Sequence, residues 1–164
     1  MLASRIERLQ QMPIFGGVSD DALAYLLEPA REVRMAAGEF FFRDGEPAQC
    51  MYVLESGRVE VLKPWRGREM PLRQFGPGDC FGEMALIDLF PRSASARAET
   101  DCVAIELTTA HLYRLYQRSI EPFALIQMNL AREMCRRLRA TDEWLFQAVM
   151  GEMPQPGDTQ YTSI

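Results

Sequence analysis

The chain has 164 residues, of which 48% are hydrophobic, and a formal net charge of -5. This length suits one domain with a real hydrophobic core, and the acidic balance argues against a nucleic-acid-binding surface, which needs a basic face. The N-terminus lacks the apolar core of a signal peptide, and no apolar run approaches membrane-spanning length. We therefore expect a cytoplasmic protein that binds neither nucleic acid nor membrane.

The histidine and cysteine content limits the chemistry further. His111 is the single histidine, which is too few for most metal-dependent jelly-roll enzymes and leaves little for a Ser-His or Cys-His nucleophile. The cysteines lack the Cys-x-x-Cys spacing of zinc and redox sites, so we expect free and mostly buried thiols; they are Cys50, Cys80, Cys102 and Cys135. The sequence thus predicts a protein that is not an enzyme, with no metal and no catalytic cofactor, and a structural role for His111.

Two helices are predicted at the start of the chain. Apolar residues recur at helical spacing within residues 4–12, and Pro13 stops this first helix. Ser19 then precedes two acidic residues, a pattern typical of a capped helix start. The second helix should end near Pro29.

From Arg31 the pattern changes to short strands separated by Gly and Pro turns. Val59 and Val61 alternate with charged residues, as expected for a strand with one buried face. Strands are expected at residues 32–35, 40–43, 51–54, 58–62, 70–75 and 102–107, with a further short strand at Phe81. About eight short strands at this spacing predict an antiparallel β jelly roll or small barrel within an α+β fold.

Helix is predicted again from Thr109, with a second start at Ser119 that continues to about Met150. One stripe on this long helix repeats every three or four residues: Ile126, Leu130, Met134, Leu138, Thr141 and Leu145. Such a helix is longer than a small barrel can cover, so part of the stripe can pack on a twin helix in a homodimer. The alternative is a helix folded entirely back onto its own barrel.

Two further features of the C-terminal region have simple interpretations. Four arginines cluster on the long helix, at Arg132, Arg136, Arg137 and Arg139, but acidic residues lie nearby in the sequence. This favours a solvated face over a nucleic-acid patch. Residues 151–164 contain two prolines and a further glycine, and they predict a flexible tail.

Residues 81–98 carry the most informative pattern, Phe-Gly-Glu-Met-Ala-Leu followed after five residues by Pro-Arg-Ser-Ala-Ser-Ala-Arg-Ala. Gly82 removes the side chain where a ligand could touch the main chain. Residues 83–86 can form the first turn of a helix, whose free N–H groups suit a phosphate. Arg92 offers a planar fork of donors to phosphate oxygens, and Glu83 offers an acceptor to a ribose hydroxyl. Each feature alone also fits a plain turn with a solvated arginine.

Together these residues resemble the phosphate-binding cassette of the cyclic-nucleotide-binding domains, which occur in bacterial catabolite-activator-type regulators, cyclic-AMP-dependent kinase regulatory subunits and cyclic-nucleotide-gated channels. Further segments resemble the family's landmarks and follow its order: Gly38-Glu39-Phe40, Asp44-Gly45-Glu46-Pro47, residues 51–57 and Gly76-Pro77-Gly78-Asp79. The resemblance implies one such domain over residues 1–150. Its parts are N-terminal helices (1–30), a β-roll (31–108) with the cassette (81–98), and C-terminal helices (109–150).

The resemblance also implies roles for individual residues. Arg92 would pair with the cyclic phosphate, and Glu83 would accept from the ribose 2′-hydroxyl. The phosphate and ribose site would comprise Gly82, Glu83, Met84, Ala85, Arg92 and Ser93. The base pocket would comprise Val61, Leu72, Cys80, Phe81, Leu138, Thr141 and Asp142.

The choice of base depends on two positions. Asp142 stands where the best-known bacterial receptor has a hydroxyl residue, and its carboxylate can accept two N–H bonds from guanine. Ser93 stands where cGMP-preferring members often carry threonine. We expect cAMP as the ligand, with cGMP as the alternative.

The expected function is that of a receptor that relays ligand binding to an unidentified effector protein through movement of the C-terminal helix. A transcription factor of this family would carry a helix-turn-helix after that helix, and only a short tail follows here, so DNA binding is expected only if the chain is a fragment. The alternatives are a regulatory fragment of a larger transcription factor, channel or enzyme, a degenerate cassette used for protein contacts, and a metal-dependent jelly-roll enzyme.

Overall fold

The computed structural model describes residues 2–151. The chain divides into two compact units, Met1–Asn129 and Leu130–Ile164, and the long helix α5 (Ile120–Val149) contributes to both. Gly151 lies in the turn that follows α5. The rest of the predicted tail, residues 152–164, lies outside the described residues.

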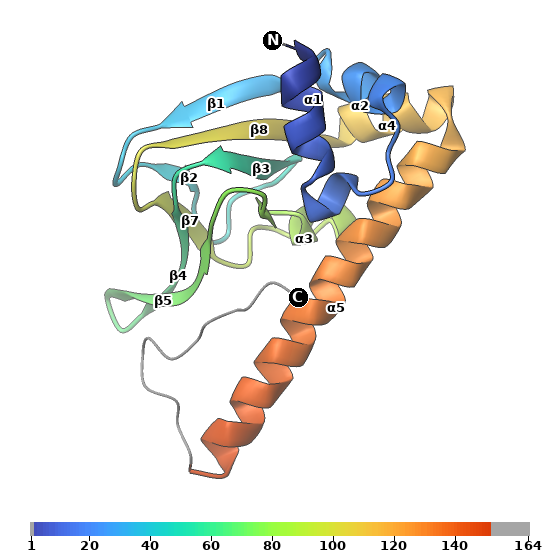
Figure 1. Ribbon diagram of the computed structural model, residues 1–164. Helices are drawn as coiled ribbons and strands as arrows, with labels where there is room; N and C mark the ends of the chain where they lie inside the picture. Colours follow the sequence, from blue (N-terminus) through green and yellow to red (C-terminus); the bar gives the residue numbers. More distant parts are fainter. Residues whose placement is uncertain (1, 152–164) are drawn as a thin grey trace. The chain divides into compact units, whose positions relative to one another are not determined.

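The first unit contains two four-stranded antiparallel sheets, which form facing layers in Figure 1. The first sheet has the order β1 (Arg31–Met35), β8 (Cys102–Thr108), β3 (Cys50–Ser56) and β6 (Cys80–Phe81). The second has the order β2 (Phe40–Phe42), β7 (Ser95–Ala98), β4 (Val59–Trp65) and β5 (Arg68–Phe75). These eight strands confirm the predicted α+β jelly roll. The hydrogen-bonded ladder does not continue from one sheet to the other, so the roll is not a closed barrel.

An aromatic cluster fills the space between the two sheets. The ring of Phe81 meets Phe41 edge-on with a centroid separation of 5.0 Å, and it stacks on Tyr52 at 5.4 Å and on Phe75 at 5.8 Å. Tyr52 and Phe81 come from the first sheet, whereas Phe41 and Phe75 come from the second. Burial of aromatic rings from both sheets is a large favourable term in folding, and it fixes the strand that leads into the cassette.

Two N-terminal helices, α1 (Leu2–Gln10) and α2 (Asp20–Leu27), confirm the sequence prediction, and the Ser19 hydroxyl accepts a hydrogen bond from the Ala22 amide as an N-cap. The short 3-10 helix η1 (Pro13–Phe15) between them was not predicted. Asn129, which is buried, holds η1 by donating to the carbonyls of Ile14 and Gly16 at 3.1 and 2.9 Å.

Helix α4 (Thr109–Arg118) follows β8 directly and packs beside α2 (Figure 1). His111 closes a capping box at its start: the Thr108 amide donates to His111 Nδ1, and the His111 amide donates to Thr108 Oγ1. Burial lowers the pKa of His111, with the charge of Arg114 acting in the same direction and that of Glu106 opposing it. The predicted structural role of the single histidine is therefore confirmed.

The second unit contains the C-terminal part of α5. Glu133 accepts from Arg136 and Arg137 on the same helix, at 3.2 and 2.8 Å. Burial alone would raise the pKa of Glu133, but the two arginines outweigh it and lower that pKa. These pairs agree with the predicted solvated basic face. None of the helices in residues 2–151 combines the length and the apolar character that a membrane crossing requires.

Candidate functional site

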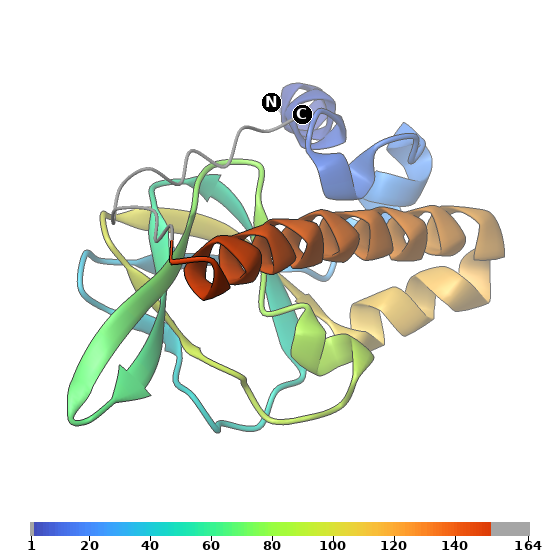
Figure 2. The same cartoon turned by 90° about the horizontal axis from the view of Figure 1, so that it is seen from below.

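The cassette is built where the first sheet ends at β6. The main chain leaves β6, turns at Gly82, and enters the short helix α3 (Met84–Ile87), with Glu83 as its N-cap residue. It returns through Pro91 and Arg92 into β7 of the second sheet. Figure 2 shows α3 in yellow-green on the loop between the strands, away from the β4–β5 hairpin. The predicted helical turn after Gly82 is thus confirmed.

Gly82 is required at its position for two reasons. Its φ of 78° lies in the left-handed region, which residues with a Cβ rarely adopt. A Cβ there would also lie 2.6 Å from Arg92 Nη1 and 3.1 Å from Phe42 Cε1. The glycine therefore makes room for the guanidinium group and for the ring beside it.

Arg92 is the central polar residue of the site. It is 5% exposed, and its Nη1 and Nη2 donate to the carbonyls of Gly82 and Cys50 at 2.8 and 2.7 Å. Its guanidinium carbon lies 4.0 Å from the centroid of the Phe42 ring. Within residues 2–151 the buried Nε has no hydrogen-bond partner, and Arg92 forms no ion pair. A buried cation therefore faces neutral oxygens, sulfur and an aromatic ring.

Other donors and acceptors of the predicted phosphate and ribose site lie on the same short stretch. In the described part of the chain, the main-chain amides of Ala85 and Ser93 donate to no protein acceptor. Glu83 is 4% exposed, Ser93 is exposed, and the Met84 side chain is 47% exposed. The structure thus brings the predicted phosphate and ribose residues together on the β6–α3 and Arg92 segments.

The residues predicted to line the base have different surroundings. Cys80 and Phe81 are buried in the core, whereas Val61 is half-buried on β4. Leu72 is 57% exposed on β5, at a bulge where Val61 pairs with Arg73 and Leu62 pairs with Pro71. Leu72 is the extra residue of that bulge, so it has no partner residue across the strand pair.

The three remaining base residues belong to the second unit. Leu138, Thr141 and Asp142 are spaced three and four apart on α5, so they share one face of the helix. All three are exposed, and the Thr141 hydroxyl donates to the Arg137 carbonyl at 2.9 Å. Their roles toward a base remain predictions.

Sequence reasoning missed the side chains that hold Arg92. Phe42 lies fifty positions before it, and Cys50 supplies both a carbonyl at 2.7 Å and a sulfur atom at 3.5 Å. The Arg92 amide also donates to the Glu46 carbonyl at 2.9 Å, and the Arg92 carbonyl accepts from Gly45. The segment Asp44-Gly45-Glu46-Pro47 resembles a landmark of the family, but the sequence gives no signal that it holds Arg92.

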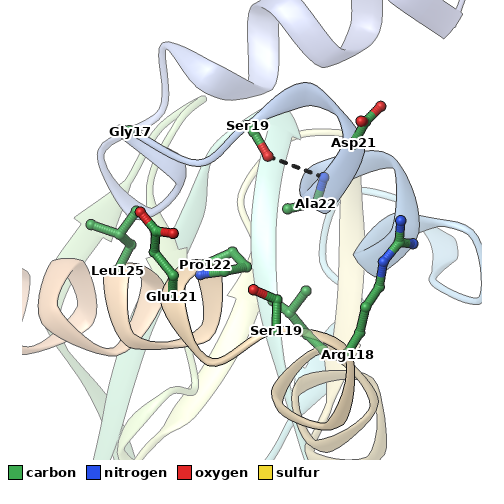
Figure 3. A pocket seen from close by; sticks show the side chains of 10 residues that line it. Gly17, Ser19, Asp21, Ala22, Arg118, Ser119, Glu121, Pro122 and Leu125 are labelled. Atoms are coloured by element: carbon green, nitrogen blue, oxygen red, sulfur yellow. Dashed lines mark hydrogen bonds between the residues drawn. The ribbon is translucent and has the colours of Figure 1, made fainter.

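A separate pocket of about 250 Å³ lies where α2, α4 and the start of α5 meet (Figure 3). Its polar lining includes the exposed side chains of Asp21, Arg118 and Glu121. None of the predicted site residues lines it. The cassette, and not this pocket, is therefore the candidate site.

Comparison with known families agrees with this geometry. The family model of the cyclic nucleotide-binding domain matches residues 32–119, which include the sheets, the cassette and α4. The chain belongs to the cyclic nucleotide-binding domain family. The resemblance noted in the sequence is thus confirmed over more than half of the chain.

Relatives of this cyclic nucleotide-binding domain include proteins named as a transcriptional regulator and as a kinase regulatory subunit. It is 32% identical over 149 residues to the CRP-like cAMP-activated global transcriptional regulator of Mycobacterium tuberculosis, covering 90% of this chain and 65% of that protein. It is 33% identical over 99 residues to the cAMP-dependent protein kinase regulatory subunit of Emericella nidulans, covering 60% of this chain and 24% of that protein.

Among solved structures, the domain is similar to the catabolite activator protein of Thermus thermophilus. The TM-score is 0.72 at 32% sequence identity, and the match covers 84% of this chain and 63% of that one. The chain therefore spans less than two thirds of the length of these relatives.

Proposed function

We propose that this chain is a receptor for a 3′,5′-cyclic nucleotide, with cAMP favoured, and that it acts in the cytoplasm without catalysis or a cofactor. The observation that carries the proposal is the buried Arg92, whose side chain has only neutral partners among the residues that the structure describes. Desolvation of a cation is costly without a counter-charge. A phosphate supplies that charge, and two of its oxygens can accept the paired N–H donors of the planar guanidinium group. The cAMP-related names of the relatives support the same ligand class.

Different residues of the cassette bind different parts of the ligand. Arg92 binds the cyclic phosphate, aided by the amides of Ala85 and Ser93 and by the Ser93 hydroxyl. Glu83 accepts a hydrogen bond from the ribose 2′-hydroxyl, and the main chain at Gly82 and Met84 lines the sugar. The Arg92 Nε and the amides of Ala85 and Ser93 support this assignment, because each is a donor without an acceptor within residues 2–151.

Binding is relayed by the C-terminal helix. Phosphate competes with the Gly82 and Cys50 carbonyls for Arg92, so the cassette rearranges around the ligand, and Leu138, Thr141 and Asp142 close over the base. The ligand shifts this equilibrium only by its differential affinity for the two positions of the helix. An effector protein would then bind according to the position of the helix. The chain would bind neither nucleic acid nor membrane.

Homodimer formation through α5 is part of the proposal. Large apolar side chains are exposed along the C-terminal half of this helix, including Leu138 at 60%, Leu145 at 59% and Val149 at 75%. The spacings of seven and four residues place these side chains in one stripe. A twin helix would bury that stripe.

Selectivity for cGMP is the alternative that one specific residue favours. The exposed Asp142 carboxylate can accept two N–H bonds from guanine but only one amino group from adenine. Asp142→Asn would then lower the affinity for cGMP more than the affinity for cAMP. Ser93→Thr would raise the affinity for cGMP. A second alternative, a regulatory part of a larger effector, is favoured by the 65% coverage of the mycobacterial regulator. An immunoblot in which the native protein has an apparent mass well above the 18.7 kDa of this chain would support that alternative.

Calorimetric titration with cAMP, cGMP and a cyclic dinucleotide tests the proposal. We expect saturable binding of cAMP at one site per chain, weaker binding of cGMP, and none of the dinucleotide. Arg92→Ala should abolish measurable binding. Arg97→Ala is the matched control, because Arg97 lies on β7 nearby but pairs with Glu60 and Glu69. Binding of cAMP by Arg92→Ala as tight as that of the wild type would show that the site is assigned to the wrong residues.

A further inference from the structure

Cys50 lies beside Arg92 in surroundings that can hold a negative charge. Its Sγ is 3.5 Å from Arg92 Nη2, and its thiol points at Tyr52 Oη at the same distance. Cys50 is half-buried at the first position of β3, whereas Cys80 and Cys102 are buried. A small reagent from solvent can therefore reach Cys50 more readily than the other two thiols of the first unit.

Arg92 donates to this sulfur atom, and Tyr52 accepts from the thiol through a hydroxyl group that can also donate. The guanidinium of Arg92 has a buried Nε without a partner in residues 2–151, and its other partners are uncharged. Burial raises the pKa of Tyr52, and its hydrogen bond with Cys50 adds to that shift, so the phenol keeps its proton at neutral pH. An anion formed on the sulfur would thus find a cation beside it and a phenol whose O–H can turn to donate to it.

We propose that Cys50 is an oxidation-sensitive regulatory site, at which peroxide converts the thiol to a sulfinate that occupies Arg92 in place of the cyclic phosphate. The inference rests on the proposed function, since it concerns the same arginine. It adds a covalent modification to the site, with hydrogen peroxide or an organic hydroperoxide as the co-reactant.

The chemistry balances in two steps. The sulfur attacks one peroxide oxygen, so an S–O bond forms while the O–O bond breaks, and the thiol becomes a sulfenic acid as water leaves, or an alcohol when the oxidant is an organic hydroperoxide. The sulfur loses two electrons and the peroxide gains them. A second peroxide repeats the step, giving a sulfinic acid that releases its proton to solvent. The resulting oxygens extend from a sulfur already 3.5 Å from Arg92 Nη2, which brings them within hydrogen-bonding reach of Arg92 and Tyr52.

Affinity for the cyclic nucleotide should fall when this anion forms, because the phosphate must then displace an internal counter-ion from Arg92. Hydrogen bonds to charged groups are strong enough that the expected loss is about 10- to 100-fold. Tyr52→Phe removes one of the two donors while keeping the ring in the core. Its affinity should therefore change less after oxidation than that of the wild type.

The experiment compares reduced and peroxide-treated protein. Each sample is titrated with cAMP by calorimetry after residual peroxide is removed with catalase, and the oxidised residues are mapped by peptide mass spectrometry. We expect two added oxygen atoms on Cys50 of the wild type, together with the loss of affinity. Cys50→Ser, with Cys50→Ala as a second variant, should show the same affinity before and after peroxide treatment, whatever its affinity in the reduced state. Cys135→Ser is the matched control, because Cys135 is exposed on α5, and this variant should remain fully sensitive.

Three results would overturn the inference: oxidation at Cys135 without oxidation at Cys50, oxidation of Cys50 with unchanged affinity, or an equal loss of affinity in Cys50→Ser. A reduced wild type that binds no cyclic nucleotide would have a different meaning. It would refute the proposed function and remove the basis of this inference with it. The reduced arm of the experiment therefore separates the two failures.

Discussion

The guanidinium carbon of Arg92 lies 4.0 Å from the centre of the Phe42 ring, so an aromatic face forms one wall around the buried cation. The loop after Phe42 also holds the arginine's main chain, since the Arg92 carbonyl accepts from the Gly45 amide and its amide donates to Glu46. The Phe42 ring therefore contacts the guanidinium group of Arg92, and the loop after Phe42 holds its main chain. Strand β2 therefore positions Arg92, although the cassette itself supplies the charge.

Replacing Phe42 by leucine should weaken cyclic-nucleotide binding without unfolding the roll. The aromatic face contributes to holding the cation, and loss of a cation–π contact corresponds to about a 2- to 30-fold change in affinity. Calorimetric titration with cAMP measures this change in affinity. The matched control is Phe40→Leu on the same strand, since the Phe40 ring also faces arginines, Arg43 at 3.8 Å and Arg97 at 5.6 Å. An equal loss in both variants would mean that Phe42 has no special role.

Gly82→Ala should lower both stability and affinity. Any alanine at this φ of 78° costs about 1–2 kcal/mol in backbone strain. At position 82 the new Cβ also displaces Arg92. Gly67→Ala is the matched control, because it introduces the strain without that displacement. Gly67 has a φ of 76° and no atom within 4 Å of a built Cβ, so it isolates the strain. We expect both variants to lose unfolding free energy in urea, Gly82→Ala more than Gly67→Ala, and a loss of cAMP affinity of at least about 10-fold only in Gly82→Ala. Normal binding by Gly82→Ala would contradict the geometry.

The strands and caps were predictable because their signals are local. Ser19 followed by two acidic residues specifies a helix start within one turn, and the alternation at Val59 specifies a strand within four residues. Strand β4 nevertheless extends to Trp65, beyond the predicted end at Leu62. The part of β4 that pairs with β7 is Val59–Leu62, so within residues 2–151 Pro64 lies on an edge of β4 that has no partner strand, where a residue without an amide hydrogen is tolerated.

The partners of Arg92 were not predictable, because they depend on contacts between distant parts of the sequence. The sequence indicates an arginine suited to phosphate, but the carbonyl of Cys50 and the ring of Phe42 meet it only after β2, β3 and the cassette have packed together. The pairing of strand edges was not predictable for a similar reason. Strand count and spacing do not reveal which strand edges pair, and here the two ladders remain separate.

His111 should make the folded chain less stable in mild acid. Its pKa is lowered in the folded state, chiefly by burial, so the unfolded chain binds the proton first as the pH falls below about 6.5. The free energy of unfolding should therefore decrease on going from about pH 7.5 to 5.5, a range where carboxylates remain ionised. Protonation also removes the Nδ1 acceptor that receives the Thr108 amide.

Urea unfolding at both pH values, followed by circular dichroism, measures this effect. His111→Gln is the informative variant, because glutamine can close the same capping box and does not titrate. It should keep most of its stability at pH 7.5 and lose the decrease toward pH 5.5. His111 is the only histidine in the chain, so an unchanged pH dependence in this variant would show that another group is responsible.

Leu145→Glu should convert a dimer into a monomer if the α5 stripe pairs with a twin helix. A carboxylate in the seam of a coiled coil would be buried without a partner, which costs several kcal/mol. Phe146→Glu is the matched control, since both side chains are 59% exposed but Phe146 lies about 100° around the helix from Leu145. Sedimentation equilibrium should give a dimer for the wild type and Phe146→Glu, and a monomer for Leu145→Glu. A monomeric wild type, with and without cAMP, would instead favour a helix folded back on its own roll.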